Sequence, residues 1–432
     1  MCVFGTWHGL TCECYATKSS FWPDKALFED YKYCSADCRF STVSNMNRRV
    51  VILLLCAFLC ATEAFHRIAM QRHKHRKLPH GRHLWASRKH MRRKFGMPAV
   101  TTQSTTNTST TSAPSEAIEP LFNAFQTQFY GPLFVSDQAF TVQFDTGSSD
   151  LWIPNSNCST CIKECSNAVF QAAKSKSFKA NGTSFSITYG VGKVSGVTAS
   201  ETVSIGQISI KDQGFGLVSQ TDTCSSFDGV LGMAYPGASV TGARPPFYQM
   251  IDQKLVDSSI FSFHLKSGDG GSLILGGSNS SLYHGSLTHV NVTQQKMWQF
   301  TMDYIGFPSK KCRRCNSCKA IMDSGTSLIV GPTEDITQLN TKIRATYNAT
   351  NGIWQVPCGR ISHLPVLELG IAGKKFQVRP QEYVIAYEGD VCITGFMDLA
   401  GLNFWIIGDV FFREHYVSFD VELNRIGIAK AK

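Results

Sequence analysis

The chain has 432 residues, of which 43% are hydrophobic and 17% charged, with 35 glycines and 29 phenylalanines. This length and apolar content suffice for two hydrophobic cores, and the composition suits many short strands joined by turns, which argues against a protein built from long amphipathic helices. The net charge of +10 belongs to the N-terminal part, because residues 1–100 hold 17 of the 42 Lys+Arg and 6 of the 32 Asp+Glu, so the other 332 residues are near neutral.

A short apolar block at residues 50–61 follows Met46-Asn47-Arg48-Arg49 and precedes Thr62-Glu63-Ala64, a small-residue cleavage site. The block is too short to span a bilayer comfortably, and this order of segments is that of a secretory signal peptide. Because 45 residues precede it, either translation starts at Met46 or the block is an internal signal-anchor, and its shortness favours the first. Residues 1–45 give no functional interpretation beyond a small Cys-rich extension.

A strongly basic stretch comes next. Residues 66–94 hold 11 Lys+Arg and 6 of the 12 His, and no acidic residue. Such a run is usually a solvated or nucleic-acid-binding tail, but its place directly after a secretory signal argues against that interpretation. Residues 101–115, TTQSTTNTSTTSAPS, are typical of an exposed linker that is open to O-glycosylation and to proteolysis. Asn-x-Ser/Thr triplets fit a secretory route, although they also arise by chance; they begin at Asn107, Asn157, Asn181, Asn279, Asn291 and Asn348.

The most informative motif occurs twice, as FDTGSSDLW with Asp145 and as MDSGTSL with Asp323. Each copy follows a β-prone run, so each Asp is expected where a strand enters a tight turn opened by glycine. An apolar-apolar-Gly run follows each copy, and its glycine, Gly232 or Gly408, comes 87 or 85 residues after the Asp. The chain therefore consists of two halves of similar plan, each with an Asp-bearing loop and a later strand that packs beside it.

Two stretches predict short surface helices by their periodicity: IDQKLVDSSIFSFHL, after Pro246, and TEDITQLNTKIRAT, from Thr333. Sixteen cysteines in a secretory protein indicate disulfides. The two three-cysteine clusters have no fourth Cys or His at ligand spacing, so zinc is not expected there. Cys224 offers the first cluster a fourth partner, whereas the second keeps one odd thiol. The clusters are Cys158, Cys161 and Cys165, and Cys312, Cys315 and Cys318.

Together with SITYGVG, FDGVLGMAYP and WIIGDVFFREHYVSFD, the doubled Asp motif resembles the pepsin and cathepsin D family of aspartic endopeptidases over roughly residues 120–432. The resemblance implies an all-β, bilobal fold with two pseudo-symmetric lobes and the active-site cleft between them, and a disulfide between Cys358 and Cys392. The basic stretch occupies the place of the family's inhibitory propeptide. The expected segments are an extension (1–45), a signal peptide (46–64), a propeptide (65–100), a linker (101–119), an N-terminal lobe (120–290) and a C-terminal lobe (291–432).

The resemblance also implies the chemistry. Asp145 and Asp323 form a catalytic dyad in which one carboxylate is ionised and takes a proton from the attacking water, while the other is protonated and donates to the carbonyl oxygen. Two carboxyl groups about 3 Å apart share a proton and titrate as a pair, an effect for which aspartic proteases are the standard case. Thr146 and Ser324 hold the two loops together. The other supporting residues are Gly147, Ser148, Gly325 and Thr326.

Substrate-binding residues follow from the same resemblance. Tyr189 corresponds to the tyrosine of a flap that closes over bound peptide, with Gly190 and Gly192 at its bend, and the Trp152 indole donates to its hydroxyl. Phe227 and Val230 line pockets. Three features depart from the family pattern: the first hairpin lacks the usual Gly-Thr-Pro turn, a valine follows the flap Tyr-Gly, and QTDTCSSFDG lacks a pocket aromatic.

The expected partners are protein and peptide substrates, bound as extended strands near large hydrophobic side chains, and the chain's own propeptide as inhibitor. No metal, organic cofactor or nucleic acid is implied, and membrane contact is expected only if residues 50–61 stay as an anchor. The predicted enzyme is a monomer of the secretory pathway, extracellular or lysosomal. The alternatives are an inactive peptide-binding relative and a membrane-anchored form; the intact dyad and its hydroxyls argue against the first.

Overall fold

The computed structural model describes residues 129–432 except 190, 191, 223, 226 and 268–270, together with the short segments 13–14, 36–37 and 66–70. The predicted signal peptide and linker, and most of the basic stretch, lie outside these residues. The chain divides into two units, Met1–Glu63 and Ala64–Lys432. In the first, β1 (Glu13–Cys14) pairs antiparallel with β2 (Ala36–Asp37).

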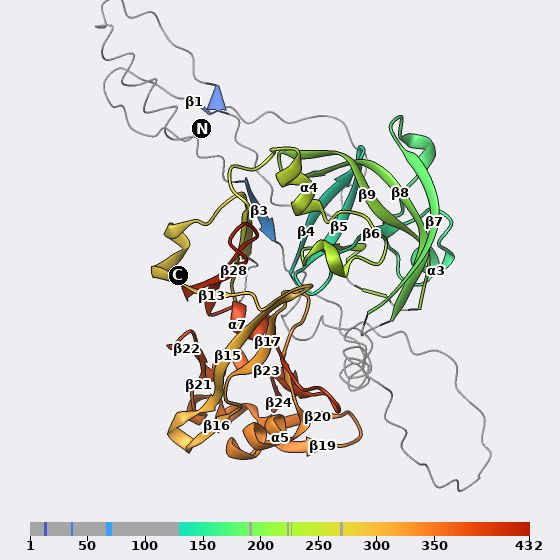
Figure 1. The fold of residues 1–432 in the computed structure, drawn as a ribbon. Helices are drawn as coiled ribbons and strands as arrows, with labels where there is room; N and C mark the ends of the chain where they lie inside the picture. The colour runs from blue at the N-terminus through green and yellow to red at the C-terminus, as the bar shows by residue number, and fades with distance from the viewer. Residues whose placement is uncertain are drawn as a thin grey trace, which may run out of the picture. The chain divides into compact units, whose positions relative to one another are not determined.

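The N-terminal lobe is a seven-stranded sheet in the order β4-β5-β10-β6-β9-β8-β7 (Figure 1). The first strand in this order, β4, also pairs with β8. Two short helices, α3 (Ser159–Lys163) and α4 (Pro246–Asp252), accompany it. The shortened first hairpin turns tightly at Ser136, whose φ is 53°. The strands are β4 (Tyr130–Val135), β5 (Gln138–Asp145), β6 (Leu151–Pro154), β7 (Lys179–Thr188), β8 (Lys193–Ile205), β9 (Ile208–Thr221) and β10 (Gly229–Gly232).

The C-terminal lobe contains a sheet in the order β22-β21-β15-β17-β26-β18-β25, to which β14 and β16 add at β15, and a smaller sheet in the order β19-β20-β24-β23. The larger sheet has β14 (Gln294–Gln295), β15 (Trp298–Phe307), β16 (Cys312–Arg314), β17 (Cys318–Met322), β18 (Ile329–Gly331), β21 (Leu367–Ile371), β22 (Lys374–Val378), β25 (Phe396–Asp398) and β26 (Trp405–Ile407). The smaller has β19 (Thr346–Asn348), β20 (Ile353–Pro357), β23 (Val384–Glu388) and β24 (Val391–Thr394). The helices are α5 (Thr333–Lys342), α6 (Pro380–Tyr383) and α7 (Asp409–Phe412).

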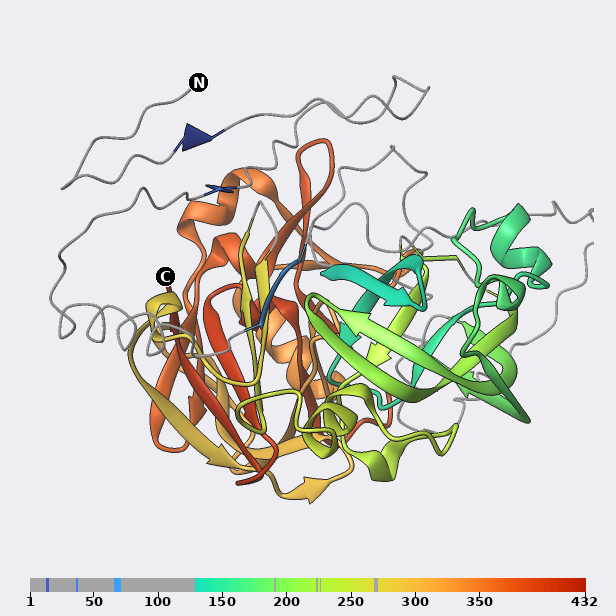
Figure 2. The same ribbon diagram turned by 90° about the horizontal axis from the view of Figure 1, so that it is seen from above.

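A third sheet, in the order β13-β28-β27-β11-β12-β3, takes strands from both halves of the chain. In Figure 2 its strands can be followed by colour, with β3 in blue, β11 and β12 in yellow, and β27 and β28 in red. The predicted lobe boundary after residue 290 falls at the last residue but one of β13. The strands are β3 (His66–Met70), β11 (Ile260–Leu265), β12 (Gly271–Leu275), β13 (Tyr283–Asn291), β27 (His415–Asp420) and β28 (Arg425–Ala431).

Aromatic side chains join the third sheet to both lobes. Phe261 stacks on Phe419 with ring centroids 4.8 Å apart, and Trp298 of β15 packs edge-on against Phe419 at 4.9 Å. The buried Trp298 indole N–H is satisfied by the Met233 carbonyl of the N-terminal lobe, at 3.0 Å. A buried Trp needs such an acceptor, so this contact ties the two lobes together at the residue directly after β10.

One helix prediction was partly wrong. In IDQKLVDSSIFSFHL only the first two residues are helical, as the end of α4, and residues 260–265 form β11. Phe261, Phe263 and Leu265 alternate along one buried face of β11, which is the period of a strand and not of a helix. The second prediction was right, because α5 covers Thr333–Lys342. Within the described residues, no helix is long and apolar enough to cross a membrane.

Disulfides account for eight cysteines of the described part. Cys358 is joined to Cys392, and Cys224 completes the first three-cysteine cluster by pairing with Cys165. The other two bridges are Cys158–Cys161 and Cys315–Cys318, which leaves Cys312 as a buried free thiol. Five of the six cluster cysteines are thus oxidised and cannot act as the thiolate ligands of a zinc ion.

Candidate active site

The two Asp motifs occupy equivalent places in the two lobes. Asp145 is the last residue of β5 and lies opposite Gly232 of the parallel strand β10. Asp323 follows β17, which pairs in parallel with β26, and its N–H donates to the Ile407 carbonyl at 3.0 Å. The apolar-apolar-Gly strands therefore lie beside the Asp loops in both halves, as the internal repeat predicted. Both carboxylates are buried, with 3% and 0% of the residue exposed.

Four hydrogen bonds join the two loops. The Ser324 N–H donates to the Thr146 hydroxyl at 2.9 Å, and the Thr146 N–H donates to the Ser324 hydroxyl at 3.1 Å. Each hydroxyl then donates to a carbonyl of the opposite strand: Thr146 to Met322 at 2.9 Å, and Ser324 to Phe144 at 2.8 Å. Because donor and acceptor alternate in this closed arrangement, every buried polar group of the junction is satisfied. The two loops are thereby fixed against each other.

Each carboxylate is also held from within its own loop. Asp145 Oδ1 accepts the Gly147 N–H at 2.8 Å, and its Oδ2 accepts the Ser148 hydroxyl at 2.5 Å. Asp323 repeats the pattern with the Gly325 N–H at 2.9 Å and the Thr326 hydroxyl at 2.6 Å. These donors contact both oxygens of each carboxyl group and so fix its orientation within its own loop.

The geometry at Gly325 shows how closely the loops approach. A Cβ atom built on Gly325 would lie 2.0 Å from Asp145 Oδ1, a distance that no side chain can occupy. Asp145 therefore packs directly on the backbone of the loop that carries Asp323, and glycine is needed there for close approach rather than for its φ angle. The structure brings both Asp residues and their six neighbours into one site.

Tyr189 and Trp152 lie on the N-terminal side of this site. The Trp152 indole donates to the Tyr189 hydroxyl at 2.7 Å, and their rings are 6.1 Å apart. Burial, and secondarily the negative charge of Asp145, hold the pKa of Tyr189 well above its usual range, so this hydroxyl stays protonated. The Tyr189 N–H closes the turn on the carbonyl of Gly192, whose φ is 94°. Gly190 and the valine after it lie outside the described residues.

Phe227 and Val230 are packed beside this pair. Val230 is the register partner of Trp152 across β10 and β6, and the Phe227 ring lies 6.4 Å from the ring of Tyr130. All four residues belong to one buried apolar cluster, which Tyr189 contacts from its edge. This cluster places apolar surface directly beside the Asp145 loop.

Asp409 is a buried acid at the site to which the motif analysis gave no role. It is fully buried, and neither of its carboxylate oxygens has a hydrogen-bond partner. Burial holds its pKa well above the usual range; the charges of Asp323 and Asp145 add to this, and Arg413 opposes it. The sequence signal was present, because an acidic residue follows Ile406-Ile407-Gly408 where the other half has Met233.

Comparison with known proteins agrees with this geometry. The family profile described as "Eukaryotic aspartyl protease" matches residues 129–431. Cathepsin D of Bos taurus is 38% identical over 340 residues, covering 72% of this chain and 87% of the bovine protein. Cathepsin D of Homo sapiens is 37% identical over 342 residues (72% and 83%), and that of Dictyostelium discoideum 37% over 328 residues (72% and 85%).

The bilobal β fold and the paired Asp loops define a pepsin-like aspartic peptidase. The chain belongs to the eukaryotic aspartyl protease family and is an aspartic endopeptidase, with peptides and proteins as its substrates.

The contact between Tyr189 and Trp152 makes a testable prediction. Tyr189→Phe keeps the ring but removes the hydroxyl that accepts from the Trp152 indole. A net hydrogen bond contributes about 0.5–1.5 kcal/mol, so kcat/KM should fall by roughly 2- to 10-fold if the contact positions the flap. Steady-state hydrolysis of a fluorogenic peptide measures this. Tyr347→Phe, on an exposed tyrosine of β19, is the control; equal kcat/KM values for both variants would contradict the role.

Proposed function

We propose that Asp145 and Asp323 are the catalytic pair of this endopeptidase and cleave peptide bonds through an activated water. The observation that carries the proposal is the mutual hydrogen bonding of Thr146 and Ser324, which holds the two Asp loops against each other. Preorganised carboxylates do not need to reorient during the reaction, which is the main way such a site lowers a barrier.

In the proposed mechanism one carboxylate is ionised and the other protonated. The ionised group takes a proton from water, the water oxygen bonds to the carbonyl carbon, and the protonated group donates to the carbonyl oxygen. The tetrahedral intermediate then collapses as its C–N bond breaks and the nitrogen receives a proton, which leaves an acid, an amine and the pair with one proton again. Since the pair must hold a proton to act, activity belongs to acidic pH.

The substrate is proposed to be an extended peptide that the Tyr189 flap covers. Phe227 and Val230 supply apolar surface near the Asp145 loop, which favours cleavage beside hydrophobic side chains. Backbone hydrogen bonds would supply affinity without sequence selectivity. The enzyme is proposed to act as a monomer.

We also propose that the enzyme is made as a secretory zymogen with residues 65–100 as propeptide. Strand β3, within this segment, pairs antiparallel with β12 at the edge of the third sheet, with Met70 opposite Gly271 and His66 opposite Leu275. This pairing supports a segment that stays bound to the enzyme until it is cut. Six histidines and eleven Lys+Arg in residues 66–94 would repel one another more as pH falls, which favours release in an acidic compartment or after secretion.

The test is to produce the chain from Met1 and from Met46, acidify the purified protein to about pH 4, and follow globin cleavage, inhibition by a statine-type inhibitor and the new N-terminus. We expect cleavage of globin, inhibition, and a mature start near residue 120. If neither the parent protein nor Asp145→Ala cleaves globin from pH 2 to 7, the result would instead support an inactive, peptide-binding protein. Cleavage without loss of residues 65–100 would refute only the zymogen.

A further inference from the structure

The hairpin of β15, β16 and β17 carries a dense group of positive charges far along the chain from the basic N-terminal stretch. Residues 310–319, KKCRRCNSCK, hold five Lys+Arg and no acidic residue. Residues 101–432 are near neutral as a whole, so this is a local concentration of charge and not a reflection of a basic protein. We call residues 310–319 with Lys374 and Lys375 the basic hairpin surface.

Most of these side chains face solvent and have no carboxylate partner. Lys310, Lys311, Arg313 and Lys319 are exposed, and in the described part of the chain none of them forms an ion pair. Arg314 is the exception: it is 27% exposed and lies 2.7 Å from Asp335 of α5, with the exposed Glu334 at 3.7 Å. The hairpin therefore presents four unpaired cations beside one that is used internally.

The adjacent strands extend the surface. The Arg313 guanidinium lies over the Tyr304 ring, 4.0 Å from its centre. The same ring packs against Gly370, where a Cβ atom would come within 2.3 Å of a ring carbon. The register partner of Gly370 on β22 is Lys375, an exposed residue. Arg313, Tyr304 and Lys375 thus form one row across β16, β15, β21 and β22.

The acidic residues near this row point inward or are already bonded. Glu368 is buried; it accepts the Tyr304 hydroxyl at 2.5 Å and lies 4.0 Å from the Lys375 ammonium. Asp303 accepts the Gly373 N–H at 2.9 Å. These contacts hold Tyr304 and the β21–β22 turn in place but leave the outward charge positive.

The surface is also rigid. The Cys315–Cys318 disulfide closes the loop between β16 and β17, and both strands are paired with β15. Arg313 and Lys319 lie on these paired strands, and Lys310 and Lys311 lie at the 3-10 turn that joins β15 to β16. Cations held on ordered backbone lose less conformational entropy when a ligand binds than cations on a flexible tail. A fixed row of Lys and Arg suits a ligand with regularly spaced anionic groups.

We propose that the basic hairpin surface binds a linear sulfated polysaccharide. No large apolar side chain is exposed among residues 303–319, so insertion into a membrane is disfavoured. The Tyr304 ring already packs under the Arg313 guanidinium and against Gly370, so it is a poor platform for stacking a nucleobase. Lys and Arg stay charged at acidic pH, and sulfate esters stay ionised there while carboxylates become protonated, so the contact persists where the enzyme acts.

The test uses a short heparin oligosaccharide and isothermal titration calorimetry at pH 5, with a variant carrying Lys310→Ser, Lys311→Ser and Arg313→Ser. The matched control carries Lys163→Ser, Lys174→Ser and Lys176→Ser, three exposed lysines of the N-terminal lobe with the same total charge change. In the full chain the hairpin variant should lose one binding event that the control keeps, since both retain residues 66–94. In the acid-processed enzyme its affinity should fall at least tenfold while the control stays within twofold.

Hydrolysis of a short peptide, equal in all three proteins, shows that the variants are folded and that the surface is separate from the dyad. Equal heparin binding by the hairpin variant and the control would overturn the proposal. Tighter binding of wild type to polyuridylate, polyglutamate or anionic lipid vesicles than to the oligosaccharide would overturn the assignment of the partner. We expect the heparin affinity to fall as the NaCl concentration is raised, because the contact is ionic. The dependence of affinity on NaCl concentration should be weaker in the hairpin variant.

Discussion

Replacing Asp323 with asparagine is expected to lower kcat by at least about 10³-fold, and Asp145→Asn should do the same. An amide cannot be ionised at working pH, so the pair can no longer share one proton between the two side chains. The fold should be retained, because the Asn oxygen can still accept the Gly325 N–H and the Thr326 hydroxyl can accept from the amide. The loss is therefore one of chemistry and not of structure.

The two replacements should not be additive. Residues that act as one unit lose most of the activity at the first substitution, so the double variant should be close to either single variant. Single-turnover kinetics at pH about 4 measures the chemical step, and a transition-state mimic checks the binding site. Asp212→Asn, on an exposed acid paired with Lys179, is the control and should keep full activity. A residual kcat above one tenth for either Asp variant would refute the dyad.

The sequence predicted the placement of the two Asp loops well, because the repeat is local. A β-prone run, an Asp and a glycine turn specify a loop after a strand, and the apolar-apolar-Gly runs need to be buried against something similar. The structure places Gly232 opposite Asp145, and Ile407 opposite Met322, in parallel pairs. The crossed hydrogen bonds of Thr146 and Ser324 were expected only from the family resemblance, since residues 178 apart carry no local signal of contact.

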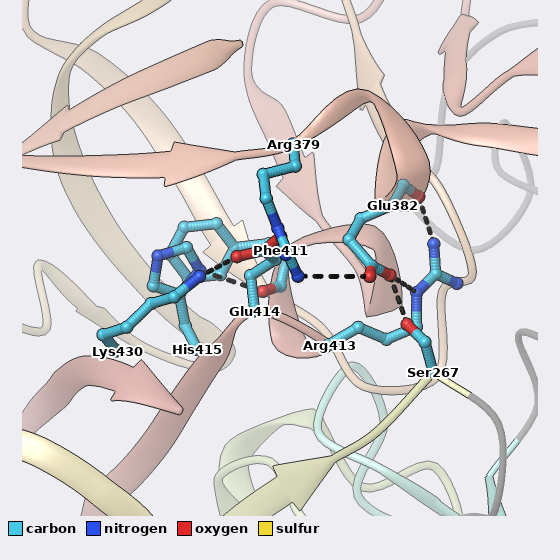
Figure 3. Close-up of polar contacts among 8 residues, drawn as sticks. All are labelled: Ser267, Arg379, Glu382, Phe411, Arg413, Glu414, His415 and Lys430. Carbon is cyan, nitrogen blue, oxygen red and sulfur yellow. Dashed lines mark hydrogen bonds and ion pairs between the residues drawn. The ribbon is translucent and has the colours of Figure 1, made fainter. Parts of the chain in front are cut away.

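Features that depend on several distant segments were not predictable in this way. The third sheet is one case: β11 pairs with β12 and with β27, a strand near the C-terminus, and no local pattern in residues 260–265 identifies these partners. The buried carboxylate of Glu414 is another case. Its partners Arg379 and Lys430 lie on other elements (Figure 3), and nothing near residue 414 in the sequence identifies them.

His415, next to this ion-pair network, is a buried histidine enclosed by aromatic rings. The residue is 2% exposed; its ring stacks on Phe411 at 4.2 Å and meets Phe376 edge-on at 5.5 Å. Its Nδ1 donates to the Phe411 carbonyl at 3.0 Å (Figure 3). Burial lowers the pKa of His415 to about 4. The adjacent Glu414 is already paired with Arg379 and Lys430, so it gives an imidazolium little support.

The direction of the effect follows from the two pKa values. An unfolded histidine has a pKa of about 6.5, so above that pH His415 is neutral in both states and costs nothing. Between pH 6.5 and about 4 the unfolded chain takes up a proton that the folded chain does not, and the free energy of unfolding falls by about 1.36 kcal/mol per unit. The loss reaches about 3 kcal/mol at pH 4, within the acidic range where the enzyme is proposed to act.

The effect of His415→Phe on the free energy of unfolding should therefore change sign between pH 7 and pH 4. At pH 7 the variant should be less stable by about 1 kcal/mol, since the Phe411 carbonyl loses its donor. At pH 4 it should be more stable than the parent by about 2 kcal/mol, because the proton-linked loss of about 3 kcal/mol is gone. Urea unfolding in an Asp323→Asn background, which prevents self-digestion, measures both. His363→Phe, on an exposed histidine, controls for the added apolar ring. If the His415 difference is the same at both pH values, the buried imidazole does not limit acid stability.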